Sequence, residues 1–248
     1  MLRKQYIIPL LALLCVFALI IVGSIPQDQN YHDFADDRKL WGISNFLNVV
    51  TNLPFAFVGM LGLRLVRKIK ERELKHISFI LFTCFLLLTI GSICYHLQPD
   101  NDTLVYDRIP MVIIFMSFFA FIIYDGIDVK TGYNAFIILN ILGIMSVIYW
   151  AISERAGRGD LRWYGLVQFF PIVAIPLIVV VYKSSFNHRK EIILIFLFFA
   201  LAKLTEKFDK EIYHLLSNTI SGHSLKHLLM VAAGNEIVIM IRTRVKPV

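Results

Sequence analysis

Long runs of apolar residues alternate with short polar connections along the whole chain. The runs are about 17 to 22 residues long, and an α-helix of that length crosses roughly 30 Å of hydrocarbon. They lack the period-two alternation that is typical of transmembrane strands. The pattern therefore predicts an all-α membrane protein.

We expect a seven-transmembrane-helix bundle with one extra N-terminal transmembrane helix. Residues 1–25 form the extra span, which we interpret as an uncleaved anchor. The alternative is a signal peptide, although the apolar run is long and no A-x-A-like cleavage site follows it. Residues 26–44 form an acidic extracytoplasmic segment, and residues 45–248 form the seven-helix core. The core spans are expected at about 45–66, 77–96, 108–124, 133–151, 165–182, 190–207 and 222–241.

Composition and charge agree with this architecture. The chain is 57% hydrophobic and 17% charged, with a mean hydropathy of +0.67, which is too apolar for a soluble domain of this length. The net charge of +7 does not indicate nucleic-acid binding, because the basic residues lie in short connections and follow the positive-inside rule. They place both termini in the cytoplasm, as an even number of spans also requires. These basic residues include Arg3, Lys4, Arg64, Arg67, Lys68, Lys130, Lys183, Arg189, Arg242, Arg244 and Lys246.

Polar residues able to do chemistry interrupt the apolar pattern at one predicted membrane boundary. Ser92 and His96 are four residues apart and share one face of a helix. Asp107 follows after a short turn. Ser92 could assist an acyl-transfer reaction by holding an oxyanion, or merely hydrogen-bond its own helix backbone. Asp107 could take a proton from water, or form an interfacial ion pair with Arg108 at a helix start.

Two further histidines, His223 and His227, begin the last span with the same four-residue spacing. This spacing lets two imidazoles bind one metal ion, although it also arises by chance. The parity of the spans places them on the outer side together with His96. Three histidines and one open position are typical of a catalytic zinc site. His96 alone has the alternative of a water-facing interfacial residue.

With this set of residues, the sequence resembles the alkaline ceramidase, adiponectin-receptor and Per1-like superfamily of membrane hydrolases. The resemblance covers roughly residues 30–241 and is nearest to the bacterial, ceramidase-like branch. It is carried by Asn45-Phe-Leu-Asn-Val-Val-Thr-Asn-Leu-Pro54, Tyr95-His-Leu-x-Pro-Asp-Asn101, Asp107-Arg-x-Pro-Met111 and Ser221-Gly-His-x-Leu-Lys-His227.

The resemblance implies a role for each residue of the set. His96, His223 and His227 would bind zinc, Asp107 would act on the water that zinc activates, and Ser92 would support the oxyanion. It also implies a calcium ion near the first core span. The similar positions here are Asp33, Asp36, Asn45 and Asn48. Arg38 stands where the family pattern places another oxygen ligand, and a cation there opposes calcium.

Together these features predict a zinc-dependent intramembrane hydrolase that cleaves an amide bond, or alternatively an ester, in a ceramide-like lipid taken from the bilayer. The expected location is a bacterial inner membrane, with the active site near its outer side. We expect no nucleic-acid partner and no obligate protein partner. Glu206 and Asp209 could line the site entrance, face water or support the histidines.

The alternative is a seven-span receptor-like or scaffold protein in which zinc is structural. A small-solute transporter is disfavoured because matching repeats in the two halves of the chain are not evident.

Overall fold

Helices make up almost all of the protein in a computed structural model, which describes residues 4–182 and 187–245. No β-strand occurs within these ranges, where the β-type pairing is confined to a single bridge between Leu40 and Ile43. Arg3, Lys183 and Lys246, which belong to the expected charge pattern, lie outside the described residues. The elements are η1 (Lys4–Tyr6), α1 (Ile7–Ile21), η2 (Gln29–His32), α2 (Phe46–Val50), α3 (Leu53–Val66), α4 (Arg72–Leu97), α5 (Asn101–Gly126), α6 (Val129–Arg155), α7 (Arg162–Val181), α8 (Arg189–Lys207), α9 (Asp209–Leu215) and α10 (Gly222–Val245).

Within the described ranges, six helical segments are long and apolar enough to cross a membrane. They are Phe46–Val66, Arg72–Leu97, Asn101–Gly126, Val129–Arg155, Arg162–Val181 and Gly222–Val245. Helix α1 has 15 residues, which extend over only about 22 Å at 1.5 Å per residue. Helix α8 has 19 residues but carries charged side chains in its first and last turns. The chain is therefore a multi-pass helical membrane protein, and the expected total of eight spans stays a prediction.

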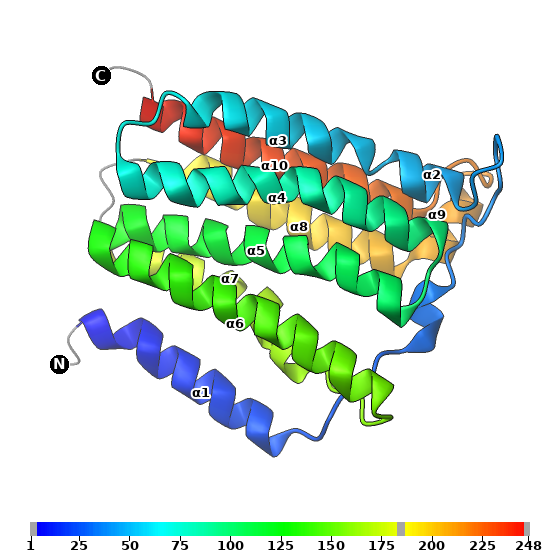
Figure 1. Ribbon diagram of the computed structural model, residues 1–248, viewed down its shortest axis with the longest axis horizontal. Helices are drawn as coiled ribbons and strands as arrows, with labels where there is room; N and C mark the ends of the chain where they lie inside the picture. Colours follow the sequence, from blue (N-terminus) through cyan, green and yellow to red (C-terminus); the bar gives the residue numbers. More distant parts are fainter. Residues whose placement is uncertain (1–3, 183–186, 246–248) are drawn as a thin grey trace.

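Helix α5 lies in the middle of the bundle, where it packs against α4, α6 and α7. Helix α10 packs against α8 and α3, and α3 in turn packs against α4. Their contacts form a continuous core of Phe, Ile and Leu side chains. Helix α1 lies outside this core and rests on α7 (Figure 1). The packing therefore agrees with the all-helical membrane bundle that the apolar pattern indicated, with α1 at its outside.

Helix direction brings distant polar residues to one end of the bundle. The start of α1 and the end of α10 lie at one end, whereas η2, α2 and α9 lie at the other (Figure 1). The end of α4, the start of α5 and the start of α10 all lie at this second end. The expectation that His96 lies on the same side as His223 and His227 is confirmed. The cytoplasmic location of the termini stays a prediction.

Helix α1 and the residues that follow it are held by polar contacts with the start of α7. Arg162 donates from Nη1 to the carbonyl of Leu19 over 3.0 Å, and the amide of Leu161 donates to the carbonyl of Ile25 over 2.7 Å. The Arg162 guanidinium also hydrogen-bonds both carboxylate oxygens of Asp160. These bonds lower the pKa of Asp160 to about 2. Residues 26–44 then run across the end of the bundle where α2 and α9 lie (Figure 1).

Candidate metal centre

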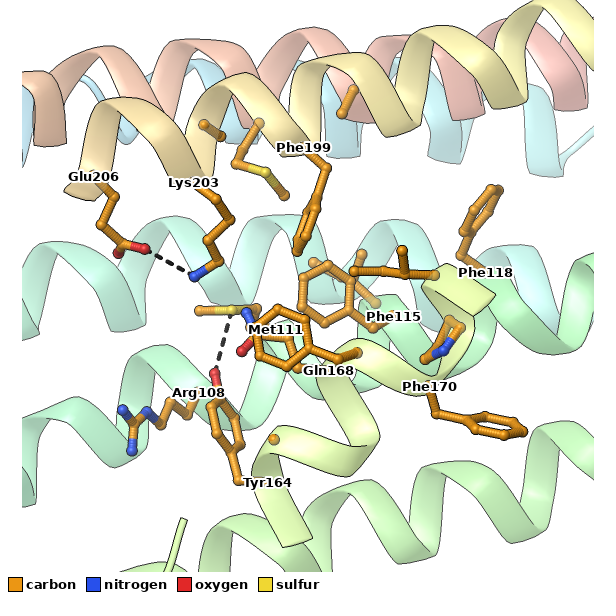
Figure 2. Close-up of a pocket in the computed structure, with 18 of the residues that line it drawn as sticks. Arg108, Met111, Phe115, Phe118, Tyr164, Gln168, Phe170, Phe199, Lys203 and Glu206 are labelled. Carbon is orange, nitrogen blue, oxygen red and sulfur yellow. Dashed lines mark hydrogen bonds and ion pairs between the residues drawn. The ribbon is translucent and has the colours of Figure 1, made fainter. Parts of the chain in front are cut away.

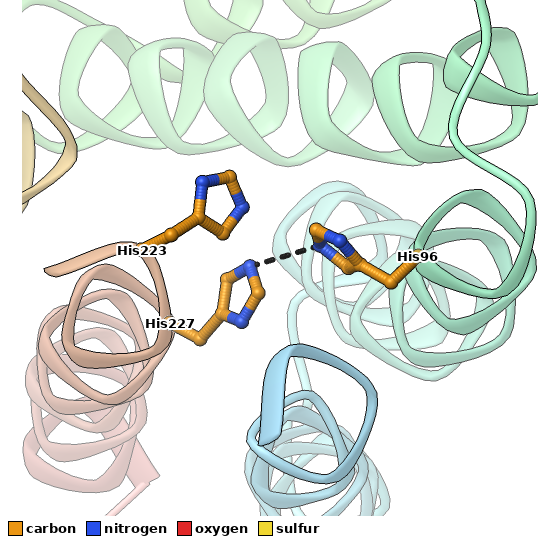
Figure 3. A group of neighbouring side chains, drawn as sticks. All are labelled: His96, His223 and His227. Carbon is orange, nitrogen blue, oxygen red and sulfur yellow. Dashed lines mark hydrogen bonds between the residues drawn. The ribbon is translucent and has the colours of Figure 1, made fainter. Parts of the chain in front are cut away.

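Three imidazole rings meet between the end of α4 and the start of α10. The ring centroids of His96, His223 and His227 are 4.9 to 5.0 Å apart. All three side chains are buried, with at most 4% of each residue exposed. One nitrogen from each ring lies within 4.8 Å of the others. Figure 3 shows the rings converging on the space between the two helices.

Close helix approach holds this end of the bundle together. At Gly91 in α4, a Cβ atom would overlap the backbone carbonyl of Tyr106 in α5. Gly222, the first residue of α10, similarly lies against the backbone carbonyl of Thr205 in α8. A larger residue at either position would push the helices apart and separate the groups that they carry.

The start of α10 is held by capping groups. Ser221 accepts a hydrogen bond from the amide of Ser224 over 3.1 Å. Asp209 in α9 accepts from the amide of His223 over 2.6 Å, and its other carboxylate oxygen accepts from the amide of Ala35 over 2.8 Å. These bonds satisfy amides that have no partner within the helix. Asp209 therefore supports the site by positioning the helix start, which was one of the roles expected for it.

Thr51 determines which nitrogen of His227 is available to a metal. Helix α2 ends at Val50 and α3 begins at Leu53, so the helical path is interrupted at Thr51 and Asn52. Pro54, which follows this interruption, has no amide hydrogen to donate to a preceding turn. The Thr51 hydroxyl at this break donates to the carbonyl of Leu47 over 2.7 Å. Its oxygen lies 2.9 Å from Nδ1 of His227, which therefore carries the hydrogen and donates it. Nε2 is then the nitrogen without a hydrogen; it faces Nε2 of His96 at 3.2 Å and is the one that can bind a metal.

The other two rings have different surroundings. Phe34, from the segment before α2, packs on His96 and His223 at centroid distances of 4.8 and 4.6 Å. Nδ1 of His96 is buried and has no hydrogen-bond partner within the described residues. Nε2 of His223 lies 2.8 Å from the ammonium nitrogen of Lys226, which also lies 3.0 Å from Glu206. Glu206 can thus retain Lys226 when the imidazole nitrogen binds a metal.

The donor set fits a zinc ion. Zinc–nitrogen bonds of 2.0–2.1 Å to a tetrahedral centre separate the nitrogens by about 3.3 Å. The Nε2 atoms of His96 and His227 are 3.2 Å apart. One ring nitrogen of His223 lies within 4.8 Å of a ring nitrogen in each of the other two histidines. A metal held there would retain at least one position for another ligand.

Ser92 and Asp107 lie beside this cluster. Both residues are buried, with 3% of Ser92 and 8% of Asp107 exposed. Together with His227 they line a cavity of about 810 Å³. Arg108 hydrogen-bonds Gln27 over 2.7 Å and stacks on aromatic rings, so the alternative of a simple Asp107 and Arg108 ion pair is not observed among the described contacts. The structure therefore groups the three histidines and places Ser92 and Asp107 on the same cavity as His227.

The cavity extends from His227 into the apolar part of the bundle, between α1, α3, α4, α5, α7, α8 and α10. Figure 2 shows Phe115, Phe118, Phe170 and Phe199 around it, with Lys203 and Glu206 at one end. Its volume lies within the range of ligand cavities. Its apolar lining suits a hydrocarbon chain.

The residues of the expected calcium site are engaged otherwise. Asp36 is 1% exposed and forms two hydrogen bonds of 2.7 Å with Arg38. Asp33 is exposed and pairs with Lys210 over 2.6 Å. Asn45 donates to the carbonyl of His96 over 2.8 Å, and Asn48 accepts from Ser224 over 2.7 Å. The calcium site stays a prediction, and an ion there would have to displace both cationic side chains.

Three neighbours of the histidines were not expected from the sequence. Thr51 and Phe34 approach the rings from segments far away in the chain, so no local spacing marks them. Lys226 lies between the two α10 histidines and was identifiable as a charged residue inside an apolar span, which is costly unless it has a function or a partner.

The family resemblance rests on these residues alone, because comparisons of the chain with protein family models, curated proteins and solved structures found no match.

Proposed function

We propose that this protein is a zinc-dependent intramembrane hydrolase that cleaves an amide bond in a lipid, as ceramidases do. The observation that carries the proposal is a group of three buried imidazoles, one of which, His227, lines a large apolar cavity together with the Asp107 carboxyl group and the Ser92 hydroxyl group. Ionisable groups at membrane depth are costly, so their gathering around a ligand-sized space favours a chemical role. The same features support membership of the superfamily that the sequence resembles.

His96, His223 and His227 would hold the metal through neutral imidazole nitrogens. Bound zinc supplies Lewis acidity, which polarises a carbonyl group and lowers the pKa of water. The apolar cavity would bind the acyl chain and place its carbonyl carbon beside Asp107 and Ser92. In this arrangement the reacting groups are oriented before the chemical step.

Asp107 would accept a proton from the attacking water as its oxygen bonds to the carbonyl carbon. Ser92 would donate a hydrogen bond to the carbonyl oxygen as negative charge develops there. When the carbon–nitrogen bond breaks, Asp107 would return the proton to the leaving amine. The products are a carboxylic acid and an amine, and no other reactant is consumed.

The test combines metal analysis with lipid turnover in purified protein. We expect one zinc ion per chain and release of fatty acid from N-palmitoylsphingosine or a related lipid amide. His223→Ala should lose both zinc and turnover. Asp107→Asn should retain zinc but turn over roughly 10²- to 10⁴-fold more slowly. His214→Ala, which replaces an exposed histidine of α9, is the matched control and should change neither.

Two results would contradict the hydrolase proposal. One is wild-type turnover by His223→Ala, which would exclude a catalytic metal at this site. The other is a zinc-loaded protein that is stabilised by the metal but hydrolyses none of a panel of lipid amides and esters. That second result would favour the receptor-like or scaffold alternative with structural zinc.

A further inference from the structure

The cavity beside the metal centre has more positive than negative side chains. Its charged lining residues are Asp107, Arg108, Arg162, Lys203, Glu206 and Lys226. Arg162 is neutralised by Asp160, which lies outside the cavity. Three cationic side chains then face two carboxylates. A neutral lipid amide would leave this excess charge without a counterion.

Glu206 is shared between two of the cations. Its Oε2 atom accepts from Lys203 over 2.8 Å, and its Oε1 atom accepts from Lys226 over 3.0 Å. The Tyr31 hydroxyl also donates to Oε1, over 3.3 Å. Burial, and next the charge of Glu206, raise the pKa of Tyr31, so this hydroxyl remains a donor. One carboxylate therefore has three donors around it.

The lysines keep donors that can serve a ligand. An ammonium group has three N–H donors, and in the described contacts the acceptor of Lys203 is Glu206. Figure 2 shows Lys203 extending from α8 into the space between Glu206 and Met111. Lys226 directs a second donor at Nε2 of His223. A metal on that nitrogen would free this donor for the cavity.

Arg108 adds a buried cation with one N–H donor that has no acceptor among the described residues. Its guanidinium carbon lies 4.0 Å from the centroid of Trp150 and 4.5 Å from that of Tyr164, so aromatic rings fix its plane. Nη2 donates to Gln27 over 2.7 Å. Nη1 has no acceptor among the described residues, although only 5% of Arg108 is exposed. A buried donor of this kind is costly unless a ligand satisfies it.

We propose that the cavity binds a lipid amide whose headgroup carries an anion, a carboxylate or a phosphate, with that anion against Lys203 and within the positive field of Lys226 and Arg108. Charge-assisted hydrogen bonds to an ammonium are strong where water is excluded. The anion would neutralise the excess cation while its hydrocarbon chain fills the apolar part of the cavity. That this lipid is the substrate rests on the proposed hydrolase function, whereas its binding does not.

The experiment compares lipids of equal chain length by native mass spectrometry of the purified, full-length protein in detergent. N-palmitoylglycine carries an amide and a carboxylate, N-palmitoylethanolamine carries the same amide without charge, and palmitate carries a carboxylate without an amide. We expect wild-type protein to bind N-palmitoylglycine at least about tenfold more tightly than N-palmitoylethanolamine. Palmitate should bind more weakly than N-palmitoylglycine. It has a single polar group, so it cannot place a carbonyl beside the metal centre and an anion against Lys203 at the same time.

Substitutions then locate the anion. Lys203→Gln should lower the ratio of the affinity for N-palmitoylglycine to that for N-palmitoylethanolamine by about tenfold. Lys203→Arg should keep the wild-type ratio. Lys207→Gln is the matched control, because Lys207 lies one turn further along α8, is exposed and does not line this cavity. It should keep the wild-type preference.

Equal binding of the two amides by wild-type protein would overturn the proposal, even if Lys203→Gln failed to fold. An unchanged preference in Lys203→Gln would do the same. Tighter binding of palmitate than of N-palmitoylglycine would show that the anion is a fatty-acid carboxylate and not a headgroup. These measurements record bound lipid and not turnover. The anion-binding proposal can therefore be refuted while the hydrolase proposal holds, and the hydrolase proposal can be refuted while anion binding holds.

Discussion

The Nε2 atoms of His96 and His227 lie 3.2 Å apart, although 131 residues separate them in the chain. His96 is in the last turn of α4 and His227 is in the second turn of α10, so this contact depends on how the two helices are placed. The two nitrogens share a hydrogen bond when one of them carries a proton, and both lone pairs become available to a shared cation when neither does. The relationship makes the metal centre the part of the molecule that is easiest to test.

Removal of zinc should destabilise the protein. A metal that binds only the folded arrangement stabilises it by mass action, by about 2.7 kcal/mol at a concentration 100 times its dissociation constant. For a chain of this size we expect chelation to lower the Tm by about 5–10 °C. Differential scanning fluorimetry checks this, with His227→Ala as a variant whose Tm should not respond to the chelator. An equal response in that variant would contradict a metal at these histidines.

Thr51→Val should weaken zinc binding by about 10- to 100-fold, since it removes the acceptor for Nδ1–H of His227 and leaves the ring without a fixed orientation. Competition with a chromogenic chelator measures the affinity. Thr89→Val is the matched control, because the Thr89 hydroxyl bonds only its helix carbonyl at Phe85, over 3.0 Å, in the described contacts. A similar loss of affinity in both variants would indicate a general effect of threonine removal.

Phe34→Ala should speed the release of zinc. Phe34 covers two of the three rings from the side of residues 26–44, and its removal opens the cluster to water and to chelators. The half-time of zinc transfer to an excess of chelator measures the effect. Trp41→Ala, in the same segment at a residue that is 89% exposed, should leave the half-time unchanged. If the two variants behaved alike, Phe34 would not act as a cover.

The stabilising effect of Asp160 should disappear in acid. Its pKa is lowered to about 2 by the Arg162 guanidinium, against about 3.9 in an unfolded chain. The folded state therefore favours the charged carboxylate. Its contribution to stability is present above about pH 4 and is lost as the pH falls through about 2.

Asp160→Asn should consequently have a lower Tm than the wild-type protein at pH 6, and the difference should shrink between about pH 4 and pH 2. Comparing the two proteins at each pH cancels the effect of other carboxylates. A difference that stayed constant through this range would show that the ion pair does not stabilise the attachment of α1.

Much of the site could be predicted because polar, ionisable residues are rare within apolar, membrane-spanning runs. Ser92, His96, Asp107, His223 and His227 interrupt apolar runs at predicted helix ends, and the parity of the spans places them on one side. Thr51 and Phe34 could not be predicted in the same way. A threonine at a helix break and a phenylalanine in a polar segment are common, and only their contacts with the rings give them a role.

The sequence by itself determined the helical membrane architecture, because the length and apolarity of each run leave few other ways to satisfy backbone hydrogen bonds in a bilayer. It also determined which polar residues could meet. Only the tertiary structure decided that the imidazole nitrogens face each other, that Arg38 and Lys210 pair with the carboxylates of the expected calcium site, and that Lys203 reaches the cavity. These outcomes depend on the rotation and crossing of packed helices, which the side chains of several distant segments set jointly.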